Sequence, residues 1–281
     1  MGWRNWLGIA VLAAAIWITP RLLLSGTIGS PYLLVHTNLT GLTMLVSLGL
    51  VLLMGYAGQL SLGHAGFFAI GAYTSAILTA KANLIGLADC GWVRAGLSHH
   101  LLMSGEDWLG ESFIRLTPWT AMAAGQVVAV AAALLLGLAT LRLRGYYMAM
   151  ATLGFGFIVY NLAENFVALT GGTGIQSIPS MPWVEGQEVR WHWVIWGTVL
   201  GAVVLMLNLI HSRVGRALRS IHGSEPAARA MGVDTTRLKL VVFVISAMLA
   251  ALAGSLYAHK NGYVGPEEAS AQRRACATSP A

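Results

Sequence analysis

The length, composition and charge of the chain indicate a membrane protein. It has 281 residues, of which 56% are hydrophobic and only 10% are charged, whereas soluble domains carry about 25% charged residues. A soluble domain is therefore excluded, and the net charge of +6 is assigned to loops that face anionic lipid. A nucleic-acid-binding surface is excluded too, because the basic residues lack the interleaved aromatic residues of a single-strand-binding groove.

Seven apolar runs are long enough to cross a hydrocarbon core of about 30 Å, which predicts an all-α, polytopic transmembrane helical bundle. The first run follows a basic start at Arg4 and has no small-residue cleavage site after it. It is therefore interpreted as a retained helix rather than a signal peptide. The predicted spans are residues 5–24, 33–54, 60–80, 119–141, 146–169, 193–211 and 240–258.

The loops between the later spans alternate in character. Residues 142–145 and 212–239 are rich in arginine, whereas residues 81–118 and 170–192 carry several acidic residues. Short basic loops stay in the cytoplasm, so the first pair is predicted inside and the second pair outside. Counting back through the spans places the N-terminus in the cytoplasm as well.

A glycine-rich stretch, residues 55–79, carries polar side chains within an apolar run. Small residues recur four positions apart along it, and such rows let membrane helices approach closely. One interpretation is a tightly packed internal helix. The other is a solute pathway lined by Gln59, Ser61 and His64, because polar residues at membrane depth face a cavity or the bundle interior.

The longest polar stretch between two apolar runs is residues 212–239, with six basic residues and two acidic ones. A short helix is predicted inside it. Ser224 suits the N-cap, Glu225 the positive end of the helix dipole, and Gly232 the left-handed position after the last turn. A helix of this length is unstable alone, so it must lie against the membrane surface or a partner protein.

Three blocks of sequence, in order, resemble one family of transport proteins. The first reads Gly-Tyr-Ala-Gly-Gln-Leu-Ser-Leu-Gly-His-Ala-Gly-Phe-Phe at residues 55–68. The second runs from Leu141-Arg-Leu-Arg-Gly-Tyr-Tyr to Thr170-Gly-Gly-Thr-Gly-Ile, and the third from Gly215-Arg-Ala-Leu-Arg-Ser-Ile to Ala227-Ala-Arg-Ala-Met-Gly-Val. Together they resemble the permeases of branched-chain amino acid ABC transporters, of the LivM type, over residues 35–266.

The resemblance implies a permease subunit of an ATP-driven importer in a bacterial inner (plasma) membrane. Its expected partners are a homologous permease, two cytoplasmic ATPases and a periplasmic substrate-binding protein, with no nucleic acid. The expected cargo is a branched-chain or related amino acid. No cofactor is expected, because the partner subunits use the ATP. The short helix is then expected to dock into a groove of an ATPase through Arg216, Arg219, Glu225, Ala227, Ala228, Arg229 and Gly232.

The chain itself shows no catalytic or metal-binding motif. It has no G-x-x-x-x-G-K-[ST] phosphate loop, no G-x-S-x-G and no H-E-x-x-H, so it is not expected to be an enzyme. An ion-driven secondary transporter is the alternative, but Glu164 is the one charge that the sequence places deep in a span. That carboxylate either reaches the membrane surface or faces the pathway and meets the ammonium group of an amino acid.

The last predicted boundary separates a transmembrane permease domain, residues 1–258, from an atypical tail, residues 259–281. The resemblance ends at Pro266, and the tail has no apolar run near the roughly 20 residues that a span requires. Permeases of this family continue into further helices. We therefore expect a permease truncated by a frameshift or an early stop, with a disordered tail and little or no transport of its own.

Overall fold

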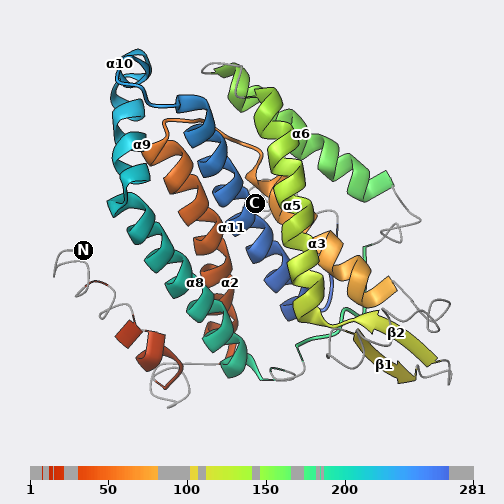
Figure 1. The fold of residues 1–281 in the computed structure, drawn as a ribbon. Coiled ribbons are helices and arrows are strands. Elements are labelled where there is room, and N and C mark those ends of the chain that lie inside the picture. The colour runs from red at the N-terminus through yellow and green to blue at the C-terminus, as the bar shows by residue number, and fades with distance from the viewer. Residues whose placement is uncertain are drawn as a thin grey trace, which may run out of the picture.

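The computed structural model describes residues 8, 13–14, 16–21, 31–81, 102–106, 112–140, 146–165, 174–181, 184 and 187–265. Within these residues, long helices lie side by side in one bundle (Figure 1). The elements are α2 (Pro31–Leu50) and its π-helical continuation η1 (Val51–Tyr56), α3 (His64–Ala76) and its π-helical continuation η2 (Ile77–Lys81), β1 (Leu102–Glu106), β2 (Ser112–Leu116), α5 (Pro118–Thr140), α6 (Tyr146–Asn165), α8 (Glu188–His211), α9 (Arg213–Gly223), α10 (Glu225–Ala230) and α11 (Thr235–Asn261).

The predicted all-α bundle is confirmed. Among the described residues, five helical segments are long and apolar enough to cross a membrane: α2 with η1, α5, α6, α8 and α11. The run predicted over residues 60–80 differs, because its helix begins only at His64 and the residues before it are not helical. Much of the first predicted run, residues 5–24, lies outside the described residues.

Helix α11 forms the centre of the bundle, and small residues let its neighbours come close. It packs against α3, α5 and α2. A Cβ atom added at Gly254 would lie 2.0 Å from the carbonyl oxygen of Phe68 on α3, and one added at Gly71 would lie 2.1 Å from that of Ala251. The two helices therefore touch backbone to backbone, which is the close small-residue packing predicted for this part of the chain.

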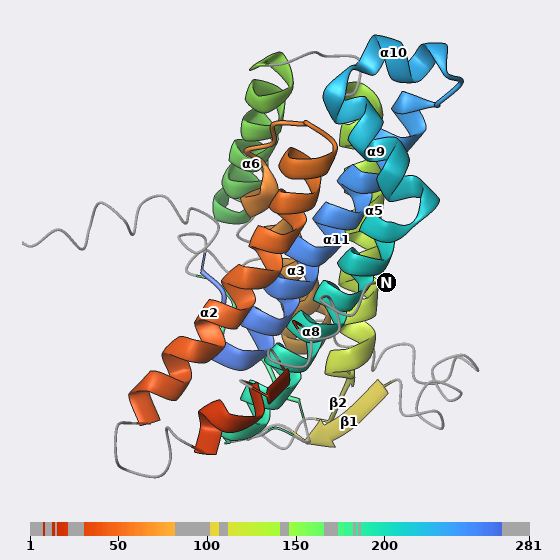
Figure 2. The same ribbon diagram turned by 90° about the vertical axis from the view of Figure 1, so that its left-hand side faces the viewer.

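The two ends of the bundle differ in the way that the loop charges predict. Helices α9 and α10 lie at one end, where α5 also ends and α6 begins (Figure 1, Figure 2). The hairpin β1–β2 lies at the opposite end. It occupies part of residues 81–118, which the sequence analysis treats as a loop, and pairs Leu102 with Leu116. The assignment of the α10 end to the cytoplasm stays a prediction.

Helix α11 extends beyond the predicted domain boundary at residue 258. It ends at Asn261, where Gly262 adopts a φ of 66°, and Val264 then pairs with Ile175. The first residues of the predicted tail therefore belong to the bundle. Residues 266–281 lie outside the described residues.

The backbone contact between α3 and α11 predicts the effect of a single added methyl group. Gly254→Ala should destabilise the fold by about 1–3 kcal/mol, because overpacking a close contact forces the backbone to shift. Gly201→Ala on α8 is the matched control. Nothing lies within 4 Å of a Cβ atom there, and alanine favours a helix over glycine by about 1 kcal/mol.

Thermal unfolding of the detergent-purified protein measures both changes. The midpoint should fall for Gly254→Ala and should rise or stay constant for Gly201→Ala. Equal midpoints for the two variants would show that the α3–α11 contact is looser than described.

Candidate functional site

An unwound segment, residues 57–63, connects η1 to α3. Side-chain exposure alternates along it: Gln59 and Ser61 are only 4% and 2% exposed, whereas Leu60 and Leu62 are 42% and 59% exposed. The polar side chains therefore face the bundle and the leucines face outwards. The N–H groups of Leu60, Ser61 and Gly63 have no hydrogen-bond partner among the described residues. The segment is thus a break in regular helical structure with an incompletely bonded backbone.

Polar groups on the inward side of this segment are buried without partners. Both amide atoms of Gln59 and the Nε2 atom of His64 find no hydrogen-bond partner in the described part of the chain. Ser61 Oγ lies 3.3 Å from His64 Nδ1, so these two side chains are joined. A buried polar group without a partner costs about 1–3 kcal/mol. The cluster therefore offers polar groups that can bond water or a polar solute.

Helix α6 holds the far end of the unwound segment inside the bundle. The Leu62 N–H donates to Thr152 Oγ1 over 3.0 Å, and a Cβ atom on Gly63 would lie 2.4 Å from the Thr152 carbonyl oxygen. Thr152 is fully buried within α6. The three predicted pathway residues Gln59, Ser61 and His64 are thus brought together on one buried face, next to a membrane-spanning helix.

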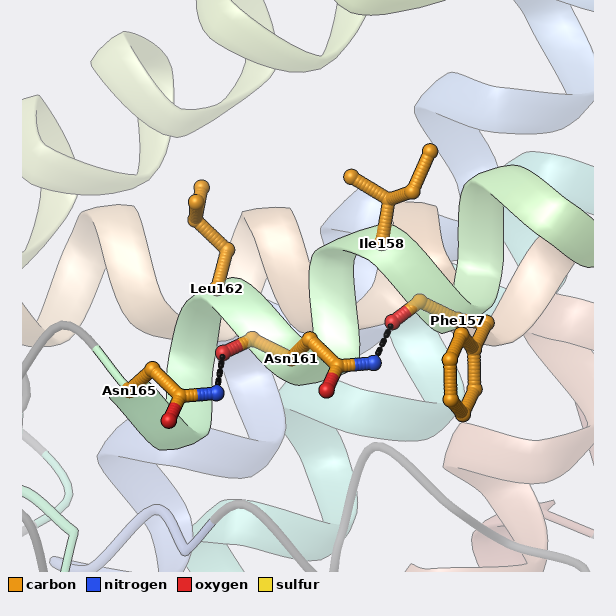
Figure 3. Close-up of a pocket in the computed structure, with 5 residues that line it drawn as sticks. All are labelled: Phe157, Ile158, Asn161, Leu162 and Asn165. Carbon is orange, nitrogen blue, oxygen red and sulfur yellow. Dashed lines mark hydrogen bonds between the residues drawn. The ribbon is translucent and has the colours of Figure 1, made fainter.

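Glu164, the fourth predicted pathway residue, lies apart from this cluster. It is exposed in the last turn of α6, towards the opposite end of that helix from the start of α3. The nearby surface depression is drawn in Figure 3, where the Asn161 and Asn165 amides donate to the carbonyl oxygens of Phe157 and Asn161 over 2.9 Å each. These amides are bonded within α6 itself, so the geometry does not connect Glu164 to Gln59.

The predicted short helix is present as α10. Ser224 occupies its N-cap position without a side-chain hydrogen bond, and Gly232 closes the turn at a φ of 81°, which glycine adopts readily. One predicted docking residue is differently placed: Ala228 is only 3% exposed, whereas Met231 is 84% exposed. Ala228 therefore packs inwards, and the exposed residues of this turn include Ala227, Arg229, Ala230 and Met231.

Glu225 joins α10 to the start of α11. Its carboxylate lies 2.6 Å from Lys239 Nζ and 2.7 Å from Arg229 Nη2, and Arg229 Nε donates to Thr235 Oγ1 over 2.9 Å. The hydrogen bond from Lys239, followed by the charges of Lys239 and Arg229, lowers the pKa of Glu225 below its ordinary 4.5. The stability that this pairing contributes is therefore complete above pH 4.5 and is lost as the pH falls through the lowered pKa.

Arg216 and Arg219, which were predicted to contact an ATPase, both hydrogen-bond the end of α8. Arg216 Nη1 donates to the His211 carbonyl oxygen over 3.4 Å, and Arg219 Nη2 donates to that of Ile210 over 3.1 Å. Basic side chains commonly satisfy the last carbonyls of a helix in this way. Both arginines brace the turn from α8 to α9, and their contact with a partner stays a prediction.

A second polar network, which the sequence analysis missed, lies at the end of the bundle away from α10. His192 Nδ1 lies 3.2 Å from Asn38 Oδ1, and Asn38 Nδ2 donates to Glu188 Oε2 over 3.1 Å. Lys260 Nζ lies 3.5 Å from the same Glu188 oxygen. The network joins α2, α8 and α11. The signal that would have revealed it is the placement of Asn38, His192 and Lys260 near that end of three neighbouring spans.

The comparison with known families decides the class of the chain. Residues 32–274 match a family described as "Branched-chain amino acid transport system / permease component". The chain belongs to this permease family. The resemblance found in the three sequence blocks is thereby confirmed.

Curated relatives agree with the family. The high-affinity branched-chain amino acid transport system permease protein LivM of Salmonella typhimurium is 34% identical over 258 residues, which cover 82% of this chain and 53% of the relative. LivM of Escherichia coli is 33% identical with the same coverage. LivH of Escherichia coli is 25% identical over 79% of this chain and 68% of the relative. The chain thus spans about half the length of its LivM relatives, and no solved structure matches it.

The unpaired amide of Gln59 predicts an unusual response to substitution. Gln59→Leu removes a buried polar group without breaking a side-chain hydrogen bond, so it should leave the stability unchanged or raise it. Asn38→Leu is the matched control, because its fully buried amide bonds Glu188 and His192. The Asn38→Leu substitution should lower the stability of the folded protein by about 1–3 kcal/mol. Both effects are measured as thermal midpoints in detergent, and an equal loss in the two variants would mean that Gln59 is bonded after all.

The Glu225 pairing predicts a change in the order of the polar loop. Glu225→Gln should release α10 from α11 and so speed tryptic cleavage after Arg229. Arg237→Gln is the control, because it breaks only the exposed pair of Arg237 with Asp234, and such pairs contribute little. Cleavage is followed by mass spectrometry. If Glu225→Gln and Arg237→Gln are cleaved at the same rate, the pairing does not hold the loop.

Proposed function

We propose that this chain is the membrane-spanning permease subunit of an ATP-driven ABC importer, with α10 as the helix that docks on a cytoplasmic ATPase. The observation that carries the proposal is the position of α10. It projects from one end of the bundle (Figure 2) and presents Met231, which is 84% exposed. It is also fixed to α11 through Glu225 and Lys239. A partner that moves α10 therefore moves the central helix of the bundle.

The cargo that we propose is a branched-chain or related amino acid, as the names of the LivM and LivH relatives suggest. Its route passes the cluster of Gln59, Ser61 and His64. These side chains are buried in the bundle, yet the Gln59 amide and His64 Nε2 lack partners among the described residues. Hydrogen bonds to water or to the charged groups of an amino acid would complete them as the pathway opens.

The partners that we propose are a homologous permease, two ATPases and a periplasmic binding protein, in a bacterial inner membrane with the N-terminus in the cytoplasm. Similarity to both LivM and LivH supports a pair of related permeases. The chain has no phosphate loop of its own, so the energy for transport comes from separate subunits. The basic character of the α9–α10 end supports its cytoplasmic placement.

Met231→Asp tests the docking of α10. The side chain is exposed, so the fold should persist, but a carboxylate in an apolar contact with the ATPase should be costly because its charge is desolvated without a partner. The expected result is loss of leucine-stimulated ATPase activity in the complete reconstituted complex, with reduced co-purification of the ATPase.

Thr236→Asp is the control for this experiment, because it adds the same charge at a nearby exposed position in the first turn of α11. It should retain stimulation by leucine. Full stimulation in Met231→Asp would exclude α10 as the docking helix.

A further inference from the structure

The unwound segment takes its direction from Gly58. The N–H of Ala57 donates to the Leu52 carbonyl oxygen over 3.3 Å, and the N–H of Gln59 donates to that of Leu53 over 3.1 Å. These two hydrogen bonds span more residues than the hydrogen bonds of an α-helix, so η1 ends irregularly. Gly58 lies between them with a φ of 63°, a left-handed conformation that glycine adopts at little cost. A small change at Gly58 therefore changes the path of the residues that follow.

The side chain of His222 lies directly against Gly58. A Cβ atom added at Gly58 would lie 3.1 Å from His222 Nδ1, so the imidazole ring fills the space that a larger residue would need. His222 is in the last turn of α9. The polar stretch at the α10 end and the unwound segment thus meet at Gly58.

Helix α9 carries His222 as part of a rigid unit. Leu218 on its inner face belongs to the same buried cluster as Leu52, Leu53 and Ala57 of the η1 region. The helical geometry continues to the start of α10, because the Ser224 N–H donates to the Ser220 carbonyl oxygen over 3.1 Å. Since Ser224 is the N-cap of α10, a displacement of α10 also displaces His222.

The unwound segment is held at its two ends and weakly between them. Gly58 lies against His222 at one end, and Leu62 bonds Thr152 at the other. Between these points the Leu60 and Ser61 N–H groups and the side-chain amide of Gln59 have no partners among the described residues. Segments with few bonds rearrange at the lowest cost in free energy. This stretch is therefore the element that yields when His222 moves.

We propose that His222 is a positioning residue, which passes the displacement of α10 to Gly58 and so turns the unwound segment that carries Gln59 and Ser61. The ring acts by its bulk against the glycine backbone. This inference rests on the proposed docking of α10 to an ATPase and adds the route by which that event reaches the polar cluster. The route runs beside α11 rather than through it.

The test follows the accessibility of Ser61 in the complete reconstituted complex. Ser61→Cys is introduced after Cys90 and Cys276 have been replaced by serine, and its labelling by a small water-soluble maleimide is measured with and without ATP. We expect the labelling rate to change with ATP in this parent. We expect the same change in His222→Phe, which keeps a ring beside Gly58, and little or none in His222→Ala.

Two further variants separate this route from a general loss of structure. Gly58→Ala places a methyl group against the His222 ring, in a backbone conformation that alanine adopts with strain, and should also suppress the ATP response. Gly262→Ala controls for backbone strain, because Gly262 has a similar φ of 66° but only a carbonyl oxygen at 3.8 Å from an added Cβ atom. It should keep the full response.

Each outcome decides one point. An ATP response in the parent that persists unchanged in His222→Ala overturns the role of His222 and leaves the proposed function intact. No ATP response in the parent, in a complex that contains all subunits, overturns both. A response that is lost in His222→Ala but kept in His222→Phe and Gly262→Ala supports the contact with Gly58 as the route.

Discussion

The backbone contact between α3 and α11 determines where the other parts of the molecule lie. Apolar helices gain little from hydrophobic association when the solvent is itself apolar, so close packing of small residues takes its place. Gly71 and Gly254 let the two backbones touch. With α3 fixed against the central helix, its first residue, His64, and the adjoining end of the unwound segment are fixed as well. The polar cluster is therefore positioned by the close approach of Gly71 to Ala251 and of Gly254 to Phe68 rather than by its own hydrogen bonds.

Helix α11 links three features that the sequence shows separately. Lys239 in its second turn pairs with Glu225 of α10, Gly254 in its third quarter contacts α3, and Lys260 at its end pairs with Glu188 of α8. Each contact joins α11 to a different part of the chain. A rigid helix with fixed points at its start and its end moves as a body, so events at the two ends of the bundle are mechanically related.

The features that depend on composition and local pattern were predictable from the sequence. Hydropathy predicts the membrane-spanning helices, and the order Ser224, Glu225 and Gly232 predicts α10 and its left-handed end. Residues 57–59 fall between the predicted spans 33–54 and 60–80, but the extension of the break to Gly63 was not predicted, because Leu60 and Leu62 keep that part of the run apolar. Only the alternating burial in the folded chain distinguishes it.

Contacts between distant segments were beyond reach for a different reason. The inward position of Ala228, the bonding of Arg219 to α8 and the meeting of His222 with Gly58 all depend on how α9 and α10 fold back on the bundle. No local pattern records that geometry. Asn38 and His192 are likewise isolated polar residues in the sequence, and they become a network only when α2 and α8 pack side by side.

The outward face of the unwound segment restricts what surrounds the protein there. Leu60 and Leu62 point outwards, and the N–H group of the exposed Leu60 has no acceptor among the described residues. Lipid acyl chains offer leucine a suitable contact but provide no acceptor, and unbonded backbone in hydrocarbon costs several kcal/mol per group. A purely hydrocarbon environment is therefore a poor solvent for this side of the bundle, and its natural neighbour is protein surface or water.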